Sequence, residues 1–440
     1  MDVRPPEGME VAHAGRSHKE FSQSFISAPP ESASGLLTGI AGVSTAIASA
    51  VLLHDWAQTV YLKTLAVLTF TALAMVAVDL LVYRVNLNST TELALEPVRP
   101  VNVRRVIQKL VGFWFTIGVI AALYALLPEY GNAFYQPFKD AALYLLPGVV
   151  VASPFYIAWV DCRQHDPVDA YAQLALLLCG QNPADWTALA LHARSWLVKA
   201  FFTPLMFVYV SSDLSAMWSD SLLPVLDFEH VFLRLTDLFY LLDVLLATIA
   251  YTLTLRVIDN HIRSVEPTIG GWIICVICYR PLVDAQAPYI QYELDKLTWG
   301  DVLAPYPWIY VLWGSLILML VFVYVWSTAI FGLRFSNLTN RGIITSGPYR
   351  WVKHPAYLAK NLSWWMISVP FVAGAGWPIA LQSCLMLCAA NLIYYLRART
   401  EERHLSADPT YRDYQTFIAE YGLFARLRRL WGLGRTKLFQ

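Results

Sequence analysis

The sequence predicts an all-α fold, a polytopic bundle of transmembrane helices that ends in a C-terminal helical hairpin. Of the 440 residues, 57% are hydrophobic and 15% are charged, whereas charged residues make up about a quarter of a soluble domain. The mean hydropathy of +0.46 agrees with a membrane protein. Apolar stretches of roughly 20 residues, the length of a helix that crosses a bilayer, recur along the chain.

Nine apolar segments are the expected spans, and short loops join most of them. The first six are Leu36–Leu53, Tyr61–Tyr83, Leu110–Leu127, Ala141–Val160, Trp196–Val210 and Leu235–Leu255. The last third contains Trp308–Phe331, Leu362–Ala373 and Trp377–Tyr395. The run Leu362–Ala373 is short for a span unless its helix begins near Ala356.

The charges of the loops predict the orientation, because Lys and Arg are in excess on the cytoplasmic side of membrane proteins. The N-terminal tail, the second loop and the C-terminal end are basic. The stretch Ser211–Glu229 contains four acidic residues and no Lys or Arg. We therefore expect a multi-pass protein of the cell membrane, with both termini in the cytoplasm and Ser211–Glu229 outside.

These charges require one more crossing than the spans provide. Six spans return the chain to the cytoplasm near Arg256, and Trp308–Phe331 must also bring Arg334 and Arg341 to that side. Thr268–Leu282 is the candidate, as a short crossing buried within protein. A miscounted helix further upstream would satisfy the charges equally well.

Acidic residues inside apolar segments mark function or bond neighbouring helices, because charge is costly in hydrocarbon. Asp79 and Asp237 lie close to Arg84 and Arg234 in the sequence, which favours a position near the membrane surface. Asp243 is the candidate for a functional role, and a helix–helix hydrogen bond is the alternative.

Two further classes of partner are not expected. Cys275 and Cys278 have the spacing of a metal or redox pair, but no second pair and no close histidine accompanies them, so we interpret them as packing residues and expect no metal. Lys plus Arg and Asp plus Glu both number 32, and no basic–aromatic motif occurs, so we expect no nucleic-acid partner.

The last third carries turn signals and polar residues that the rest of the chain lacks. Ser346-Gly347-Pro348 and His354-Pro355 enclose a polar and aromatic loop directly before a membrane segment. Ala373–Pro378 then separates two apolar runs, which predicts a helical hairpin.

The hairpin is expected to gather polar groups at the membrane surface. It would place His354 and Tyr357 at one foot and Arg397 and Glu401 at the other. Arg397 and Glu401 are four residues apart and therefore share one helix face.

Four short motifs follow one another in this segment: Gly347-Pro348-Tyr349, Lys353-His354-Pro355-Ala356-Tyr357, Arg397 to Leu405, and Tyr411 to Tyr414. In this order they resemble the isoprenylcysteine carboxyl methyltransferases and their phospholipid methyltransferase relatives. That family has a Gly-Pro-Tyr-like turn, Arg-His-Pro-x-Tyr, a membrane hairpin, Arg-x-x-x-Glu-Glu-x-x-Leu and a Tyr-x-x-Tyr stretch. The likeness extends from about Trp308 to Phe424.

The resemblance implies S-adenosylmethionine as the methyl donor, held beside the hairpin. The residues that would bind it are Ile343, Ile344, Tyr349, His354, Pro355, Tyr357, Glu401 and Glu402. Arg397 would be the catalytic residue that faces the methyl acceptor. Lys353 in place of the family's arginine, and Asp408-Pro409 before the tyrosine stretch, depart from the pattern and affect the expected shape of the pocket.

The residue types fit that donor on physical grounds. The sulfonium cation is attracted to aromatic faces, at about 0.5–2 kcal/mol per contact. A glutamate can hold the ammonium or a ribose hydroxyl, and a histidine can reach the carboxylate. Arg397 could orient an anionic acceptor, and positioning can supply about 7–11 kcal/mol of the barrier.

The expected organisation is a flexible cytoplasmic tail (1–34), a multi-pass membrane region of unknown role (35–305), a methyltransferase-like core (306–425) and a basic tail (426–440). The expected function is methylation, on oxygen or nitrogen, of a lipid-like or prenylated acceptor at the cytoplasmic face of the bilayer. Two alternatives stay open: a nicotinamide-dependent reductase of the related sterol reductase type, and a non-catalytic transporter or scaffold that would use Asp243.

Overall fold

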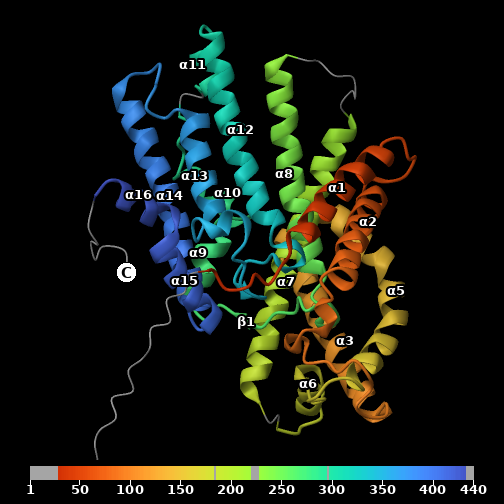
Figure 1. Cartoon of the computed structure of the whole chain (residues 1–440). Coiled ribbons are helices and arrows are strands. Elements are labelled where there is room, and N and C mark those ends of the chain that lie inside the picture. Colours follow the sequence, from red (N-terminus) through yellow and green to blue (C-terminus); the bar gives the residue numbers. More distant parts are fainter. Residues whose placement is uncertain (1–27, 183–184, 220–226, 295–296, 433–440) are drawn as a thin grey trace, which may run out of the picture.

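The computed structural model describes residues 28–182, 185–219, 227–294 and 297–432 (Figure 1). Within these ranges the chain forms sixteen α-helices and one two-stranded antiparallel sheet, which confirms the all-α prediction. Most of the expected tail (1–27), part of the expected external loop (220–226) and the end of the basic tail (433–440) lie outside the described residues.

The helices of the first half are α1 (Leu36–Leu52), α2 (Val60–Leu81), α3 (Val103–Leu126), α4 (Pro128–Gly131), α5 (Gln136–Asp161), α6 (Ala170–Leu178), α7 (Trp186–Ser219) and α8 (Phe228–Thr252). Those of the second half are α9 (Ile269–Val276), α10 (Leu282–Gln286), α11 (Trp299–Leu303), α12 (Pro307–Ala329), α13 (Pro355–Ser368), α14 (Trp377–Leu405), α15 (Pro409–Tyr421) and α16 (Leu423–Leu430). The strands are β1 (Ser264–Val265) and β2 (Thr339–Asn340). Short 3₁₀ turns are η1 (Val85–Leu87), η2 (Ser89–Thr91), η3 (Ala133–Tyr135), η4 (Arg256–Ile258), η5 (Gly332–Arg334) and η6 (Gly347–Arg350).

Six helical segments of the described chain are long and apolar enough to cross a membrane, as expected for a multi-pass protein. They are α2, α3, η3 with α5, α7, α12 and α14. The helix α1 is apolar but has only 17 residues. The helix α8 covers the expected span Leu235–Leu255 and carries Arg234, Asp237 and Asp243, and it is not among the six. The helix α13, with 14 residues, extends about 21 Å and is shorter than the hydrocarbon core.

The helices α8 and α12 run in the same direction, so the chain between them returns to the side from which α8 starts (Figure 1). At their starts, the rings of Phe228 and Tyr310 lie 5.6 Å apart. Just beyond their ends, Asn260 donates to the carbonyl oxygen of Leu333 at 3.3 Å. The candidate for this return, Thr268–Leu282, is not one continuous helix. The helix α9 has eight residues, or about 12 Å, and α10 follows it as a separate turn.

The apolar core lies where α1, α2, α7 and α8 meet. Leu245 and Leu246 of α8 pack with Leu214 of α7 and Met75 of α2, and each of these side chains is at most 1% exposed. In the same region the hydroxyl of Thr38 on α1 donates to Asp79 on α2, which is buried. The carboxylate of Asp79, in the last turn of α2, therefore bonds α2 to the first turn of α1.

Arg341 ties the loop after α12 to the end of α8. Its guanidinium is 2% exposed and donates to the carbonyl oxygens of Asn260 (2.6 Å), Ala250 (2.8 Å), Leu253 (2.8 Å) and Phe335 (2.9 Å). The last carbonyls of a helix have no partner within the helix, and a cation there is favourable. Directly beside it, β2 pairs with β1, so the N-terminal region and the last third share one sheet.

The residues just before α1 form a strap across the same loop. The backbone N–H of Ala33 donates to the carbonyl oxygen of Ile343 at 2.9 Å. The hydroxyl of Thr345 donates to the carbonyl oxygen of Pro30 at 2.6 Å. Arg334 donates to the carbonyl oxygen of Ala33 at 2.7 Å. Residues 28–34, expected to belong to a mobile tail, therefore have defined positions against the motif segment.

Candidate functional site

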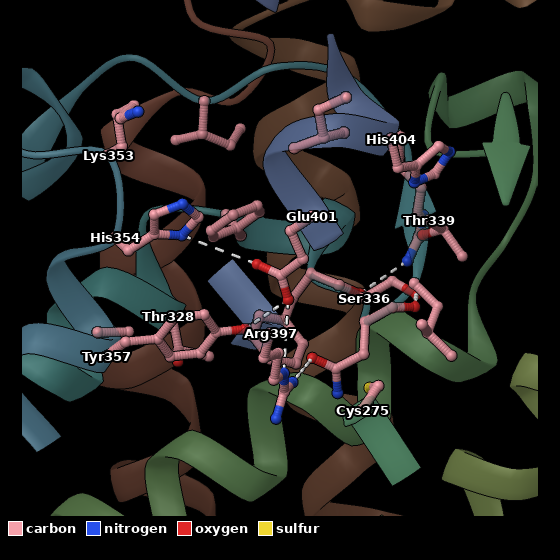
Figure 2. A pocket seen from close by; sticks show the side chains of 18 of the residues that line it. Cys275, Thr328, Ser336, Thr339, Lys353, His354, Tyr357, Arg397, Glu401 and His404 are labelled. Carbon is pink, nitrogen blue, oxygen red and sulfur yellow. Dashed lines mark hydrogen bonds and ion pairs between the residues drawn. The ribbon is translucent and has the colours of Figure 1, made fainter. Parts of the chain in front are cut away.

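One cavity lies at the foot of the α13–α14 hairpin, among α9, α12, α15 and the loop 331–354 (Figure 2). Its volume is about 190 Å³, against the roughly 10–15 Å³ that one water molecule requires. It is therefore large enough for an organic ligand. Among the expected site residues, Ile343, Ile344, Tyr349, His354, Tyr357, Arg397 and Glu401 line it.

The hairpin brings its two feet together as expected, and proline explains where α13 begins. Pro355 is the first residue of the helix, a position where its missing N–H costs nothing. His354 therefore lies just ahead of the helix, with its Nδ1 3.8 Å from Oε2 of Glu401 (Figure 2). Tyr357, one turn into α13, donates its hydroxyl proton to Oε1 of Glu401 and stacks on the His354 ring at 5.5 Å.

Arg397 is held in place from several sides. It is 4% exposed, and its guanidinium donates to the side-chain oxygen of Asn337 and, at 3.3 Å, to the hydroxyl of Tyr279 (Figure 2). Its Nε lies 3.5 Å from Oε1 of Glu401 and has no hydrogen-bond partner among the described residues. The guanidinium also lies over the Tyr357 ring, 5.2 Å from its centroid. A bound molecule could therefore use a donor that is already oriented.

Glu402 and Pro355 differ from the other expected site residues, because neither lines the cavity. Oε1 of Glu402 lies 2.7 Å from Nζ of Lys353 and 3.1 Å from Nε2 of His354, and Oε2 lies 3.2 Å from Arg399. Glu402 thus orients the His354 ring through its Nε2, without lining the cavity itself. Lys353, which departs from the family pattern, pairs with Glu402.

The loop and α15 form the other wall. Ile343 and Ile344 are buried, and the backbone carbonyl of Tyr349 accepts the hydroxyl proton of Tyr414 at 2.7 Å. Burial raises the pKa of Tyr411 well above its ordinary value, so its hydroxyl keeps its proton. That hydroxyl is buried and has no hydrogen-bond partner in the described part of the chain.

The second departure from the family pattern has a structural role in this wall. Asp408 accepts the backbone N–H of Thr410 at 2.9 Å and the side-chain amide of Asn340 at 2.9 Å. The first bond caps the start of α15, and Pro409 is the first residue of that helix. The pair Asp408-Pro409 therefore fixes α15 beside β2.

Sequence reasoning missed several residues that line the cavity. They are Glu266, Cys275, Cys278, Tyr279, Tyr324, Thr328, Asn337, Lys360, Tyr394 and His404. Half of them come from α9, α12 and the deeper turns of the hairpin, and His404 lies within the Arg397 to Leu405 motif. The one available signal was the three-residue spacing of Tyr357 and Lys360, which puts both on one face of α13.

Asp243, the candidate functional acid, bonds two helices at the edge of this cavity. Its carboxylate on α8 accepts the hydroxyl protons of Tyr324 and Thr328, both on α12. Because those two side chains line the cavity, Asp243 fixes part of its wall.

Comparison with known proteins agrees with this geometry. Residues 309–407 match the model of the isoprenylcysteine carboxyl methyltransferase (ICMT) family. No curated protein and no solved structure matches the chain. The matched range contains all but the first two residues of α12, the hairpin and every expected site residue. The last third of this multi-pass membrane protein is thus identified as an ICMT-family segment, which supports a membrane methyltransferase.

Proposed function

We propose that the protein transfers a methyl group from S-adenosylmethionine to an oxygen or nitrogen atom of a lipid-like or isoprenoid acceptor, at the cytoplasmic face of the membrane. The observation that carries the proposal is the convergence of His354, Tyr357, Arg397 and Glu401 on one cavity within the family segment. A cavity built on a membrane hairpin suits an acceptor that is itself dissolved in the bilayer.

The residues present fit this donor. Glu401 would bind the ammonium group or a ribose hydroxyl, and His354 would reach the carboxylate. The faces of Tyr349 and Tyr357 would attract the sulfonium cation, and Ile343 and Ile344 would contact the apolar parts. The buried hydroxyl of Tyr411 has no partner among the described residues, and a bound donor could supply one.

When bound, S-adenosylmethionine supplies an electrophilic methyl group, so the protein has mainly to align the acceptor. Arg397 is the candidate for that task. Asn337, Tyr279 and Glu401 fix its guanidinium before any ligand enters, so little entropy is lost on binding. A carboxylate or phosphate held by Arg397 would place its oxygen at a fixed point in the cavity, and such positioning can supply about 7–11 kcal/mol of the barrier.

The deciding experiment incubates membranes containing the protein with donor labelled in its methyl group, followed by identification of the labelled species. Labelling should depend on the wild-type protein and fall at least a hundredfold with Arg397→Ala. Arg350→Ala, which changes an exposed arginine of η6, should retain wild-type labelling. Equal labelling by the wild type and the Arg397 variant would contradict the proposal. Tight binding of a nicotinamide cofactor without binding of S-adenosylmethionine would favour the reductase alternative.

A further inference from the structure

We propose that α16 is a membrane-surface helix that docks on anionic lipids, with its apolar side in the bilayer and its arginines among the headgroups. The helix lies at the outer edge of the structure, beside α14 (Figure 1). None of its residues lines the cavity. The inference therefore concerns a second surface of the protein and does not depend on the proposed function.

The two sides of α16 differ in their contacts. One side packs against the protein through Ala425, which is buried. The other side presents large apolar residues, at three- and four-residue spacing, that are all exposed: Leu423, Phe424, Leu427, Leu430 and Trp431. Leu430 and Trp431 are 80% and 77% exposed, so the described chain leaves this side largely uncovered.

Arginines flank the apolar side of α16. With 3.6 residues per turn, Arg426 lies on one flank with Arg429 next to it, and Arg428 lies on the other. The helix contains no Asp or Glu. Arg426 donates to the carbonyl oxygen of Tyr421 at 2.8 Å, and Arg429 donates to that of Glu420 at 2.5 Å. An apolar stripe between cationic flanks is typical of helices that lie in the plane of a membrane surface.

The position of α16 fits such a surface. The backbone N–H of Leu423 donates to the carbonyl oxygen of Trp351 at 2.8 Å, and the guanidinium of Arg426 lies 4.7 Å from the centroid of the Trp351 ring. Trp351 belongs to the loop that ends at Pro355, where α13 begins. The helix α16 therefore starts at the level where the apolar hairpin starts. Tryptophan is enriched at that level, the boundary between hydrocarbon and water.

The charge of α16 selects an anionic bilayer as the partner. The apolar side alone would suit neutral lipid, a second copy of the chain or another protein. Each arginine close to an anionic surface adds about fivefold to the affinity. The basic C-terminal end is expected on the cytoplasmic side, whose leaflet holds the anionic lipids of a cell membrane. Docking would also hold Trp351, three residues before His354, at the bilayer surface.

The test compares the purified full-length protein, one copy per nanodisc, in two lipid compositions. One is phosphatidylcholine alone, and the other contains about one third phosphatidylglycerol, which supplies the negative surface potential. Hydrogen–deuterium exchange with mass spectrometry follows the backbone amides of residues 423–431. Exchange should be at least threefold slower with the anionic lipid, because docking suppresses opening of the helix. High salt should reduce this difference, because it screens the charges.

Matched double variants locate the effect. Arg428→Gln with Arg429→Gln should abolish the difference between the two compositions and keep the wild-type exchange rate in phosphatidylcholine, which shows that the helix is still folded. Arg428→Lys with Arg429→Lys should keep the difference, because the charge is retained. Arg104→Gln, at an exposed position on α3, should behave as the wild type. If the glutamine variant unfolds α16, the response of the wild type to lipid and salt decides.

Three outcomes would overturn the inference. Equal exchange of the wild type in both compositions would show that α16 has no preference for anionic lipid. An unchanged difference in a folded glutamine variant would assign the preference to other residues. Slow exchange that appears only in nanodiscs holding two copies would show that the apolar side binds a second copy. None of these results bears on methyl transfer, because the measurement uses neither donor nor acceptor.

Discussion

At the scale of single residues, Glu401 connects the two feet of the hairpin. One carboxylate oxygen accepts the hydroxyl proton of Tyr357 and lies 3.5 Å from Nε of Arg397, and the other lies 3.8 Å from His354. Its negative charge is therefore placed where a cationic ligand can reach it.

Glu401→Ala should weaken binding of S-adenosylmethionine about tenfold or more, because the loss of one charged hydrogen bond costs roughly 1.5–3 kcal/mol. Isothermal titration calorimetry on the wild type and the variant measures this. Glu129→Ala, at a half-buried position in α4 that does not line the cavity, is the control. Equal affinity of Glu401→Ala and the wild type would remove Glu401 from the donor site.

His261, in the loop between η4 and β1, predicts how stability depends on pH. Burial lowers its pKa to about 3, against 6.5 for a histidine in water, and its Nδ1 has no hydrogen-bond partner among the described residues. Between these two values only the unfolded chain takes up the proton, so stability is lost as the pH falls from 6.5 towards 3.

The variant His261→Gln removes this proton uptake. Its melting temperature in detergent should fall less between pH 7 and pH 4.5 than that of the wild type. His230→Gln, which changes an exposed histidine at the start of α8, should keep the wild-type slope. Parallel curves for the wild type and His261→Gln would refute the assignment of this pH dependence to His261.

The motif residues of the site could be found from the sequence because they lie close together along it. His354 and Tyr357 are three residues apart, and Arg397 and Glu401 are four apart. Tyr279 and Asn337 could not be found in this way. They contact Arg397 from 118 and 60 residues away, and nothing in their local sequence distinguishes them from other loop residues.

At the scale of elements, close approach between helices depends on single glycines. A Cβ atom on Gly112 of α3 would lie 2.1 Å from the carbonyl oxygen of Tyr171, at the start of α6. A Cβ atom on Gly118, six residues further along α3, would meet nothing within 4 Å. These two glycines of one helix form a matched pair.

Gly112→Ala should destabilise the protein by about 1–3 kcal/mol, because α6 has to move away from α3. Gly118→Ala should be neutral or stabilise it by up to about 1 kcal/mol, since alanine favours helix. Thermal unfolding in detergent compares the two. A stable Gly112→Ala protein would show that α6 is not packed against α3 as described.

The sequence predicts the hairpin as a definite structural element. For the extra crossing, it predicts only that one is needed. Ala373–Pro378 marks the hairpin turn, and α14 begins within it, at Trp377. The candidate for that crossing, Thr268–Leu282, is not one continuous helix. Arg280 precedes Pro281, and a residue before proline avoids the helical region, so α9 and α10 are separate. The apolar composition of this segment predicts that it enters the membrane, but it does not show where its helices end.

At the scale of the whole molecule, the last third is interleaved with the rest of the chain. Arg341 binds carbonyls at the end of α8, β2 pairs with β1, and the strap before α1 bonds to Ile343 and Thr345. Glu266 and Tyr279 line the cavity from the region before α12. Such contacts join positions far apart in the sequence, so no local pattern could reveal them.

Residues 306–432 expressed alone should therefore fail to bind S-adenosylmethionine, whereas the full chain should bind it. Co-expression with residues 1–305 should restore binding at least in part, because these residues supply the contacts that the fragment lacks. Fluorescence-detected gel filtration and calorimetry on the purified proteins measure folding and affinity. A monodisperse fragment with full-chain affinity would show that the family segment is an independent domain.

The bonds of Arg341 also constrain how the protein is made. Translation proceeds from the N-terminus, so the carbonyl groups of Ala250 and Leu253 leave the ribosome roughly 90 residues before the guanidinium that binds them. Until then water or the insertion machinery has to solvate these groups. The N-terminal helices can enter the bilayer early, but the cavity at the foot of the hairpin can close only in a final step, after nearly the whole polypeptide has been synthesised.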